Sequence, residues 1–343
     1  ILVYIRCFLR INFRIQIGSL YIILASFIFF MMTYLFNNEL LTYNYVISEL
    51  RIFMVYCVPL IILVPLLHDT DKLLNVFYFA SYFMSFVALI SFVLILFGLE
   101  TVRDYSMSYG KAAMIPSIFL FSKAFRENTV KDYVLAGMCT AAIFILGSRW
   151  PLLCVGSFII YGFISKKYLN KMRRILSIML LIIIFFFLAT NHIKMLTGLN
   201  IFLNRHGVNS RTISMILNDK TIYDSGRSQI YQQLTSKLQE SPLLGYGAFG
   251  GVVALDDELP HNFLLDVWAN FGYVGGSVVL MYSAYMTLKY FWVNRGSAYS
   301  ELIAVYACMI WPKITIGESF WSSDKYWMLM SLILLGGHIK LST

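Results

Sequence analysis

The sequence predicts an all-α fold, in which the 343 residues form a single polytopic helical membrane domain. Of these residues, 59% are hydrophobic and only 13% are charged, whereas soluble domains are about half apolar and about a quarter charged. Several apolar runs also reach the ~20 residues that a helix needs to cross a bilayer. These runs lack the alternating pattern of membrane β-barrel strands, and they therefore favour helices.

The apolar runs predict about ten transmembrane helices, counted at the length that a bilayer requires. They are expected at residues 17–36, 52–67, 73–99, 112–122, 133–147, 150–164, 175–190, 273–293, 302–316 and 326–339. The first is an uncharged run, and the polar interval 37–51 that follows it is expected to be a loop. Pro59 and Pro65 should bend the second helix. Ser148 and Arg149 separate the fifth helix from the sixth.

The distribution of lysine and arginine predicts the orientation in the membrane. The densest basic run, KKYLNKMRR at residues 166–174, is expected on the cytoplasmic side. Alternation of the helices then places both termini inside and the long polar interval 191–260 outside, as an extracytoplasmic loop with short amphipathic helices. Membrane topology and contact with membrane lipids account for the net charge of +9, so no nucleic-acid partner is expected.

A helix within this loop is expected to begin after Asp224 and Ser225, which suit an N-cap. Arg227, Tyr231 and Leu234 follow at helical spacing, so the arginine shares a face with apolar residues. Two interpretations stay open for Arg227. It either extends its charge from an interface into water, or it binds phosphate through its planar, bidentate guanidinium.

A second short helix is predicted at residues 261–271, with a polar face formed by Asn262, Asp266 and Asn270. His261 would lie in its first turn, where the helix dipole disfavours the imidazolium form. A neutral imidazole suits a general base at pH 7, although a lone histidine is also compatible with a structural role. If His261 is structural, Asp266 is the next candidate base.

Gly245, Gly247 and Gly250 form a G-x-G-x-x-G pattern between these two helices. No βαβ unit surrounds the pattern, so a dinucleotide site is rejected. The glycines instead predict a tight turn or a close approach of the backbone to a substrate.

Three short motifs lie between residues 226 and 275. They are Gly226-Arg227-x3-Tyr231, Pro242-Leu-Leu-Gly245-Tyr-Gly247 and His261-Asn262-x9-Gly272-x2-Gly275. The set resembles the O-antigen polymerase and O-antigen ligase superfamily of bacterial polysaccharide assembly. Ser148-Arg149 before an apolar run resembles a second motif of that group, and the long outer loop fits it as well.

The resemblance implies a metal-independent glycosyltransferase of the C-class architecture, without cofactors, in the bacterial plasma (inner) membrane. Its donor would be an undecaprenyl-pyrophosphate-linked oligosaccharide, used at the extracytoplasmic face to build O-antigen of lipopolysaccharide, or capsule. A flippase and a chain-length regulator are implied partners. The resemblance assigns catalysis to His261, Arg227 and Arg211. It assigns substrate binding to Arg149, Arg205, Asn262, Tyr231 and Asp266. Arg149 is also compatible with an anchor at the membrane interface, and Arg205 and Arg211 with ordinary loop charges.

Three alternatives remain beside a polymerase. In the ligases a leucine usually takes the position of Tyr231, and this departure favours the polymerase over an O-antigen ligase. A lipid-linked oligosaccharide flippase would carry buried charges within its helices, and here only Lys313 and Glu318 lie near the end of one. A non-catalytic assembly partner would not need the His261-Asn262 motif.

Overall fold

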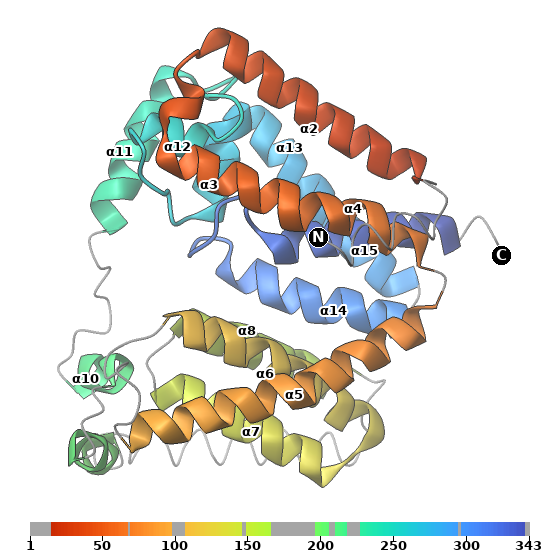
Figure 1. The fold of residues 1–343 in the computed structure, drawn as a ribbon, viewed down its shortest axis with the longest axis vertical. Helices are drawn as coiled ribbons and strands as arrows, with labels where there is room; N and C mark the ends of the chain where they lie inside the picture. Colours follow the sequence, from red (N-terminus) through yellow and green to blue (C-terminus); the bar gives the residue numbers. More distant parts are fainter. Residues whose placement is uncertain are drawn as a thin grey trace. The chain divides into compact units, whose positions relative to one another are not determined.

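The computed structural model describes residues 15–67, 69–97, 107–145, 149–165, 196–205, 210–217, 227–293 and 296–339. In these ranges every regular element is helical (Figure 1). The chain divides into two compact units, the first formed by residues 1–70 and 224–343 and the second by residues 71–223. The predicted helix at 175–190, the basic run 166–174, Ser148 and Asp224–Gly226 lie outside the described residues.

The first unit contains the candidate site. Its helices are α2 (Ile17–Phe36), η1 (Leu40–Thr42), α3 (Asn44–Ile52), η2 (Phe53–Cys57), α4 (Val58–Leu63), η3 (Val64–Leu66), α11 (Arg227–Glu240), α12 (Gly250–Ala254), α13 (Phe263–Val293), α14 (Ala298–Ile310), η4 (Trp311–Lys313) and α15 (Asp324–Ile339). The four elements from α3 to η3 form one continuous apolar helix, Asn44–Leu66. It packs with α2, α13, α14 and α15 into a helical bundle (Figure 1).

The second unit is a smaller bundle of α5 (Thr70–Leu96), α6 (Met107–Glu127), α7 (Val130–Ile145), α8 (Arg149–Ile164) and α10 (Arg211–Leu217), with a further helical segment at 196–205. Helix α6 packs against both α7 and α8. The ring of Phe77 on α5 stacks on Phe119 of α6, with ring centres 4.9 Å apart. Apolar side chains therefore fill the interior of this unit as they do in soluble bundles.

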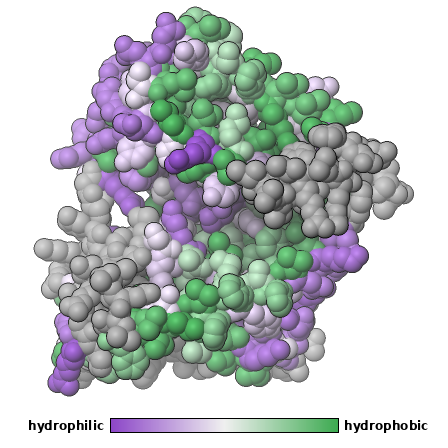
Figure 2. Space-filling view, viewed as in Figure 1, coloured by the Kyte–Doolittle hydropathy of each residue, from purple (hydrophilic) through white to green (hydrophobic). Residues whose placement is uncertain are grey.

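Four described helices are long and apolar enough to cross a membrane: Ile17–Phe36, Asn44–Leu66, Thr70–Ile95 and Phe263–Trp292. Helix α8 is also apolar but shorter. The expected total of about ten helices that cross the bilayer stays a prediction. Figure 2 shows the hydrophobic surface of α2 on one side of the first unit and hydrophilic residues gathered around α11 on the other.

The sequence predictions about local structure are wrong at α3 and at the bounds of α6. Residues 44–51 were expected to lie in a loop but form α3, because Val46 and Glu49 are buried in the bundle. Packing partners from distant parts of the chain stabilise this helix, and a local polar composition does not reveal them. Helix α6 also extends well beyond the predicted 112–122 and continues through Pro116.

Candidate active site

The site is organised around a break in α13. Gly272 has φ 72° and ψ 173°, so the helix stops there and resumes at Tyr273. The turn that follows α11 covers the break: the Tyr246 N–H donates to the Ala269 carbonyl (2.7 Å), and the Tyr273 N–H donates to the Pro242 carbonyl (2.8 Å). The turn thus satisfies backbone groups that an unbroken helix would pair internally.

The glycine pattern serves this contact. A Cβ atom at Gly245 would lie 2.6 Å from the Ala269 carbonyl oxygen, and one at Gly250 would overlap the same atom. A Cβ at Gly247 would overlap the side chain of Thr33 on α2. Of the two roles predicted for these glycines, a turn and a substrate contact, the structure accounts for the first, because the closely approaching backbone is the protein's own.

Helix α11 presents the predicted apolar face to the bundle. Leu234 and Leu238 are buried in a cluster with Ala254, Leu255 and Ala269. One turn nearer the start of the helix, the Tyr231 hydroxyl donates to the His261 carbonyl (3.1 Å). The half-buried Arg227 side chain forms no ion pair or hydrogen bond with the described residues.

His261 is fixed through its backbone. It has a left-handed φ of 48°, and its carbonyl also accepts a hydrogen bond from the Gly317 N–H (2.7 Å). Because such a conformation cannot continue a right-handed helix, α13 begins at Phe263 and not at His261 as predicted. Asn262 is its N-cap and accepts from the Leu265 N–H (3.1 Å).

The polar face of the first part of α13 points into the protein. Asn270 Oδ1 accepts from Trp321 Nε1 (2.7 Å) and from the Gly250 N–H (3.2 Å). Asp266 Oδ2 accepts from the Ser319 hydroxyl (2.8 Å) and the Phe320 N–H (2.7 Å). Asp266 is only 1% exposed. Its carboxyl therefore joins α13 to the segment that carries Ser319 and Phe320. Its contact with substrate stays a prediction.

Asp257 joins the loop before His261 to α3. Its carboxylate accepts from the backbone N–H groups of Asn44 (3.0 Å) and Tyr45 (2.8 Å) at the start of that helix. These backbone donors lower the pKa of Asp257, with the Tyr45 N–H the larger cause. The carboxylate therefore caps α3 from a distant part of the sequence and opposes the positive end of the helix dipole.

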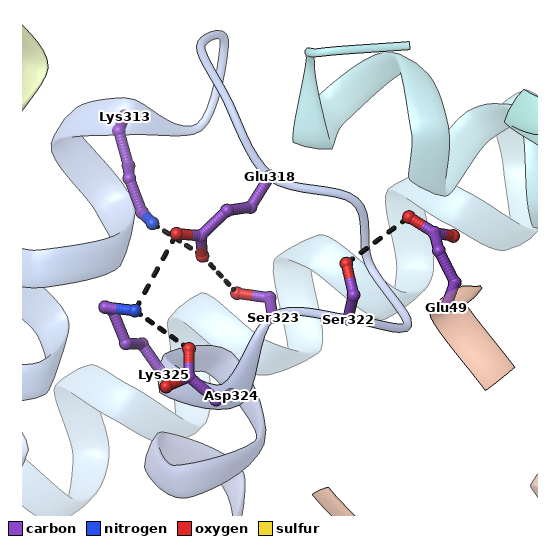
Figure 3. Close-up of polar contacts among 7 residues, drawn as sticks. All are labelled: Glu49, Lys313, Glu318, Ser322, Ser323, Asp324 and Lys325. Atoms are coloured by element: carbon purple, nitrogen blue, oxygen red, sulfur yellow. Dashed lines mark hydrogen bonds and ion pairs between the residues drawn. The ribbon is translucent and has the colours of Figure 1, made fainter. Parts of the chain in front are cut away.

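The linker between α14 and α15, residues 311–323, contacts the His261 carbonyl through the Gly317 N–H. The linker and the start of α15 also hold charged side chains that the sequence did not connect (Figure 3). Buried Lys313 pairs with Glu318 (2.7 Å). Lys325 lies 3.7 Å from Glu318 and 2.8 Å from Asp324. Ser322 donates to Glu49 of α3 (3.3 Å). The signal available in the sequence was the presence of charged residues next to apolar helix ends.

The remaining predicted arginines belong to the second unit. Arg149 begins α8, Arg211 begins α10, and Arg205 is the last described residue of the helical segment at 196–205. Arg149 and Arg205 are exposed, and only the backbone of Arg211 is described. Their convergence on His261 stays a prediction. In the part of the chain that the structure describes, no group of three or more His, Cys, Asp or Glu side chains could hold a metal ion.

Residues 134–280 match the model of the family described as O-antigen ligase. No curated protein and no solved structure matches the chain. The matched segment runs from α7 into α13 and includes Arg149, Arg227 and His261. The match supports a relationship of this chain to the O-antigen polymerase and ligase superfamily, a glycosyltransferase-like group, and the long apolar helices agree with a membrane protein.

Proposed function

We propose that this protein is a polysaccharide polymerase that joins undecaprenyl-pyrophosphate-linked repeat units of O-antigen, capsule or exopolysaccharide at the outer face of the plasma membrane. The contact between the Tyr231 hydroxyl and the His261 carbonyl (3.1 Å) is the observation that carries the proposal. It joins the helix that begins at Arg227 to the segment of the candidate base. An arginine for an anionic leaving group and a base for an acceptor hydroxyl are thus held on one scaffold.

The reaction needs two kinds of assistance. His261 takes the proton of the acceptor hydroxyl as its oxygen forms a bond to the anomeric carbon of the donor glycan. The bond between that carbon and the pyrophosphate oxygen breaks, and undecaprenyl pyrophosphate leaves as an anion. Arg227 holds this anion through its guanidinium, with Arg149, Arg205 and Arg211 as further donors.

Tyr231 favours polymerisation over ligation. The leucine that is usual in the ligases has no hydroxyl and could not donate to the His261 carbonyl as Tyr231 does. The outer interval 191–260 also contains Tyr, Asn and Ser residues, which suit stacking on sugar faces and hydrogen bonding. It has no large additional segment for docking a bulky acceptor lipid.

An O-antigen ligase is the second candidate, and the description of the matching family model supports it. The bond-making chemistry is the same in both cases. Only the acceptor differs: it is the end of another repeat unit for a polymerase, and a lipid or protein for a ligase.

Deletion of the gene separates these two functions. Loss of a polymerase should leave surface glycan that is one repeat long and still attached to its final carrier. Loss of a ligase should leave long chains on the lipid carrier and none on the final acceptor, and this result would overturn the polymerase proposal. A purified-protein assay with lipid-linked glycan tests whether the protein is an enzyme, because a flippase or an assembly partner would form no glycosidic bond.

A further inference from the structure

Two buried carboxyl groups meet at one serine beside the candidate active site. Glu49 comes from α3, Asp266 from α13 and Ser319 from the linker between α14 and α15. The Ser319 hydroxyl oxygen lies 2.8 Å from Glu49 Oε2 and 2.8 Å from Asp266 Oδ2. The two acids are 4% and 1% exposed, respectively.

Counting the available hydrogens shows that this arrangement needs a further proton. Ser319 carries one hydroxyl hydrogen and can donate it to only one of the two carboxyl oxygens. If both acids were ionised, the other 2.8 Å contact would join two lone pairs in a buried environment, which costs free energy. With a single proton on one acid, both contacts of Ser319, with Glu49 and with Asp266, become hydrogen bonds.

The other hydrogen bonds indicate which acid carries this proton. Asp266 Oδ2 accepts a second hydrogen bond, from the Phe320 N–H (2.7 Å), as suits a carboxylate. Glu49 Oε1 accepts from the Ser322 hydroxyl (3.3 Å), which leaves Oε2 to donate. The proton thus fits on Glu49 Oε2, which donates to Ser319, and Ser319 donates to Asp266.

The charges on the surrounding elements are engaged elsewhere. On the linker and α15, Lys313 and Lys325 pair with Glu318, and Lys325 also pairs with Asp324. In the loop before His261, Asp257 caps α3. Within the described ranges no ion pair includes Glu49 or Asp266. Among the described residues, no cation therefore substitutes for the shared proton.

We propose that Glu49 and Asp266 share one proton through Ser319, and that Glu49 is thereby a positioning residue for His261. The shared proton holds the linker against α3 and α13. The same linker holds the His261 segment, because the Gly317 N–H donates to the His261 carbonyl and the Leu264 N–H donates to the Ile314 carbonyl (2.9 Å). The positioning role rests on the proposed transferase function, whereas the shared proton does not.

Activity of the full-length protein in lipid nanodiscs, with a lipid-linked repeat unit as substrate, tests the positioning role. Loss of the shared proton should lower kcat of the wild type at alkaline pH. Glu49→Gln keeps a donor towards Ser319 without an ionisable proton, so it should retain kcat and lack this alkaline decline. Glu49→Ala and Ser319→Ala should lower kcat by about 10- to 100-fold, because misplacing a reacting group has costs of that order, with little change in KM. Ser331→Ala is the matched control and should behave like the wild type, because this buried serine donates to the Trp327 carbonyl of its own helix (2.6 Å).

Two further measurements detect the proton without using activity. The infrared spectrum of the wild type at neutral pH should contain a protonated-carboxyl C=O band that Glu49→Gln lacks. An unfolded chain holds no proton on a glutamate at neutral pH, whereas the native pair holds one. The free energy of unfolding of the wild type should therefore fall with rising pH, relative to that of Glu49→Gln.

The possible results distinguish the shared proton from the positioning role of Glu49. An active wild type without the infrared band overturns the shared proton. Loss of activity in Glu49→Gln as large as in Glu49→Ala also overturns it, because a negative charge would then be required. Full activity in Glu49→Ala and Ser319→Ala overturns the positioning role. An infrared band in a wild-type protein that forms no glycosidic bond leaves the shared proton in place and rejects the proposed function together with the positioning role.

Discussion

His261 is held by interactions of its carbonyl with Tyr231 and Gly317, so its imidazole ring is not required for these backbone contacts. Its left-handed φ of 48° limits the choice of substitution, because asparagine adopts this conformation more readily than alanine does. A variant can therefore remove the base and keep the local backbone.

We expect His261→Asn to lower turnover by about 10²–10⁴-fold, the contribution typical of a general base, while the protein remains folded. The measurement is glycosidic bond formation by the purified variant, with its thermal unfolding as the control for folding. Near-normal turnover would assign His261 a structural role.

Arg227 offers a second test at the scale of one residue. We expect Arg227→Lys to be much less active than the wild type although it keeps the charge. Lysine lacks the planar guanidinium that binds a pyrophosphate at two points. Donor KM and kcat should be compared in the wild type, Arg227→Lys and Arg227→Gln. Equal activity of the lysine variant and the wild type would show that only a diffuse charge is needed.

At the scale of elements, the break in α13 positions both the His261 segment and the turn that carries the glycine pattern. A Cβ at Gly272 would overlap the Leu243 carbonyl, and the backbone there has φ 72°. We expect Gly272→Ala to destabilise the protein by more than the ~1 kcal/mol typical of a mutation and to abolish activity.

The control for this variant is Gly137→Ala on α7, where a Cβ meets no atom within 4 Å. Alanine favours a helix over glycine by about 1 kcal/mol, so the control should be neutral or slightly stabilising. Thermal unfolding in detergent compares the two. Equal unfolding temperatures would contradict the role of the break.

The cap on α3 predicts a dependence on pH. Hydrogen bonds from α3 lower the pKa of Asp257, so its contribution to stability is present above the ordinary aspartate value of about 4. It is lost as the pH falls through the lower native pKa. The difference in unfolding temperature between the wild type and Asp257→Asn should therefore shrink on acidification. Asp256→Asn is the neighbouring control, and a difference independent of pH would contradict this explanation.

At the scale of the whole molecule, the candidate residues come from two units, with His261 and Arg227 in one and Arg149, Arg205 and Arg211 in the other. Both sets can serve one reaction only if the segments that carry them face the same side of the membrane. The orientation predicted from lysine and arginine places all of them outside.

Cysteine labelling tests this topology. In a variant without its native cysteines, Asn218→Cys should react with a membrane-impermeant reagent on intact cells, whereas Lys171→Cys should react only after the cells are opened. The opposite pattern would reverse the orientation and move the proposed reaction to the cytoplasmic face.

The sequence alone determined the helical membrane class, the bounds of α2 and the helix that carries Arg227, because these depend on local hydropathy, periodicity and short-range spacing. Only the tertiary structure decided that Asn262 caps α13, that the glycines pack on protein backbone, and that α3 replaces an expected loop. It alone brought Glu49 to Ser319, which is 270 residues away in the sequence. Such a contact depends on which helix faces pack together, and the partner of a buried polar group cannot be read from its own neighbours in the chain.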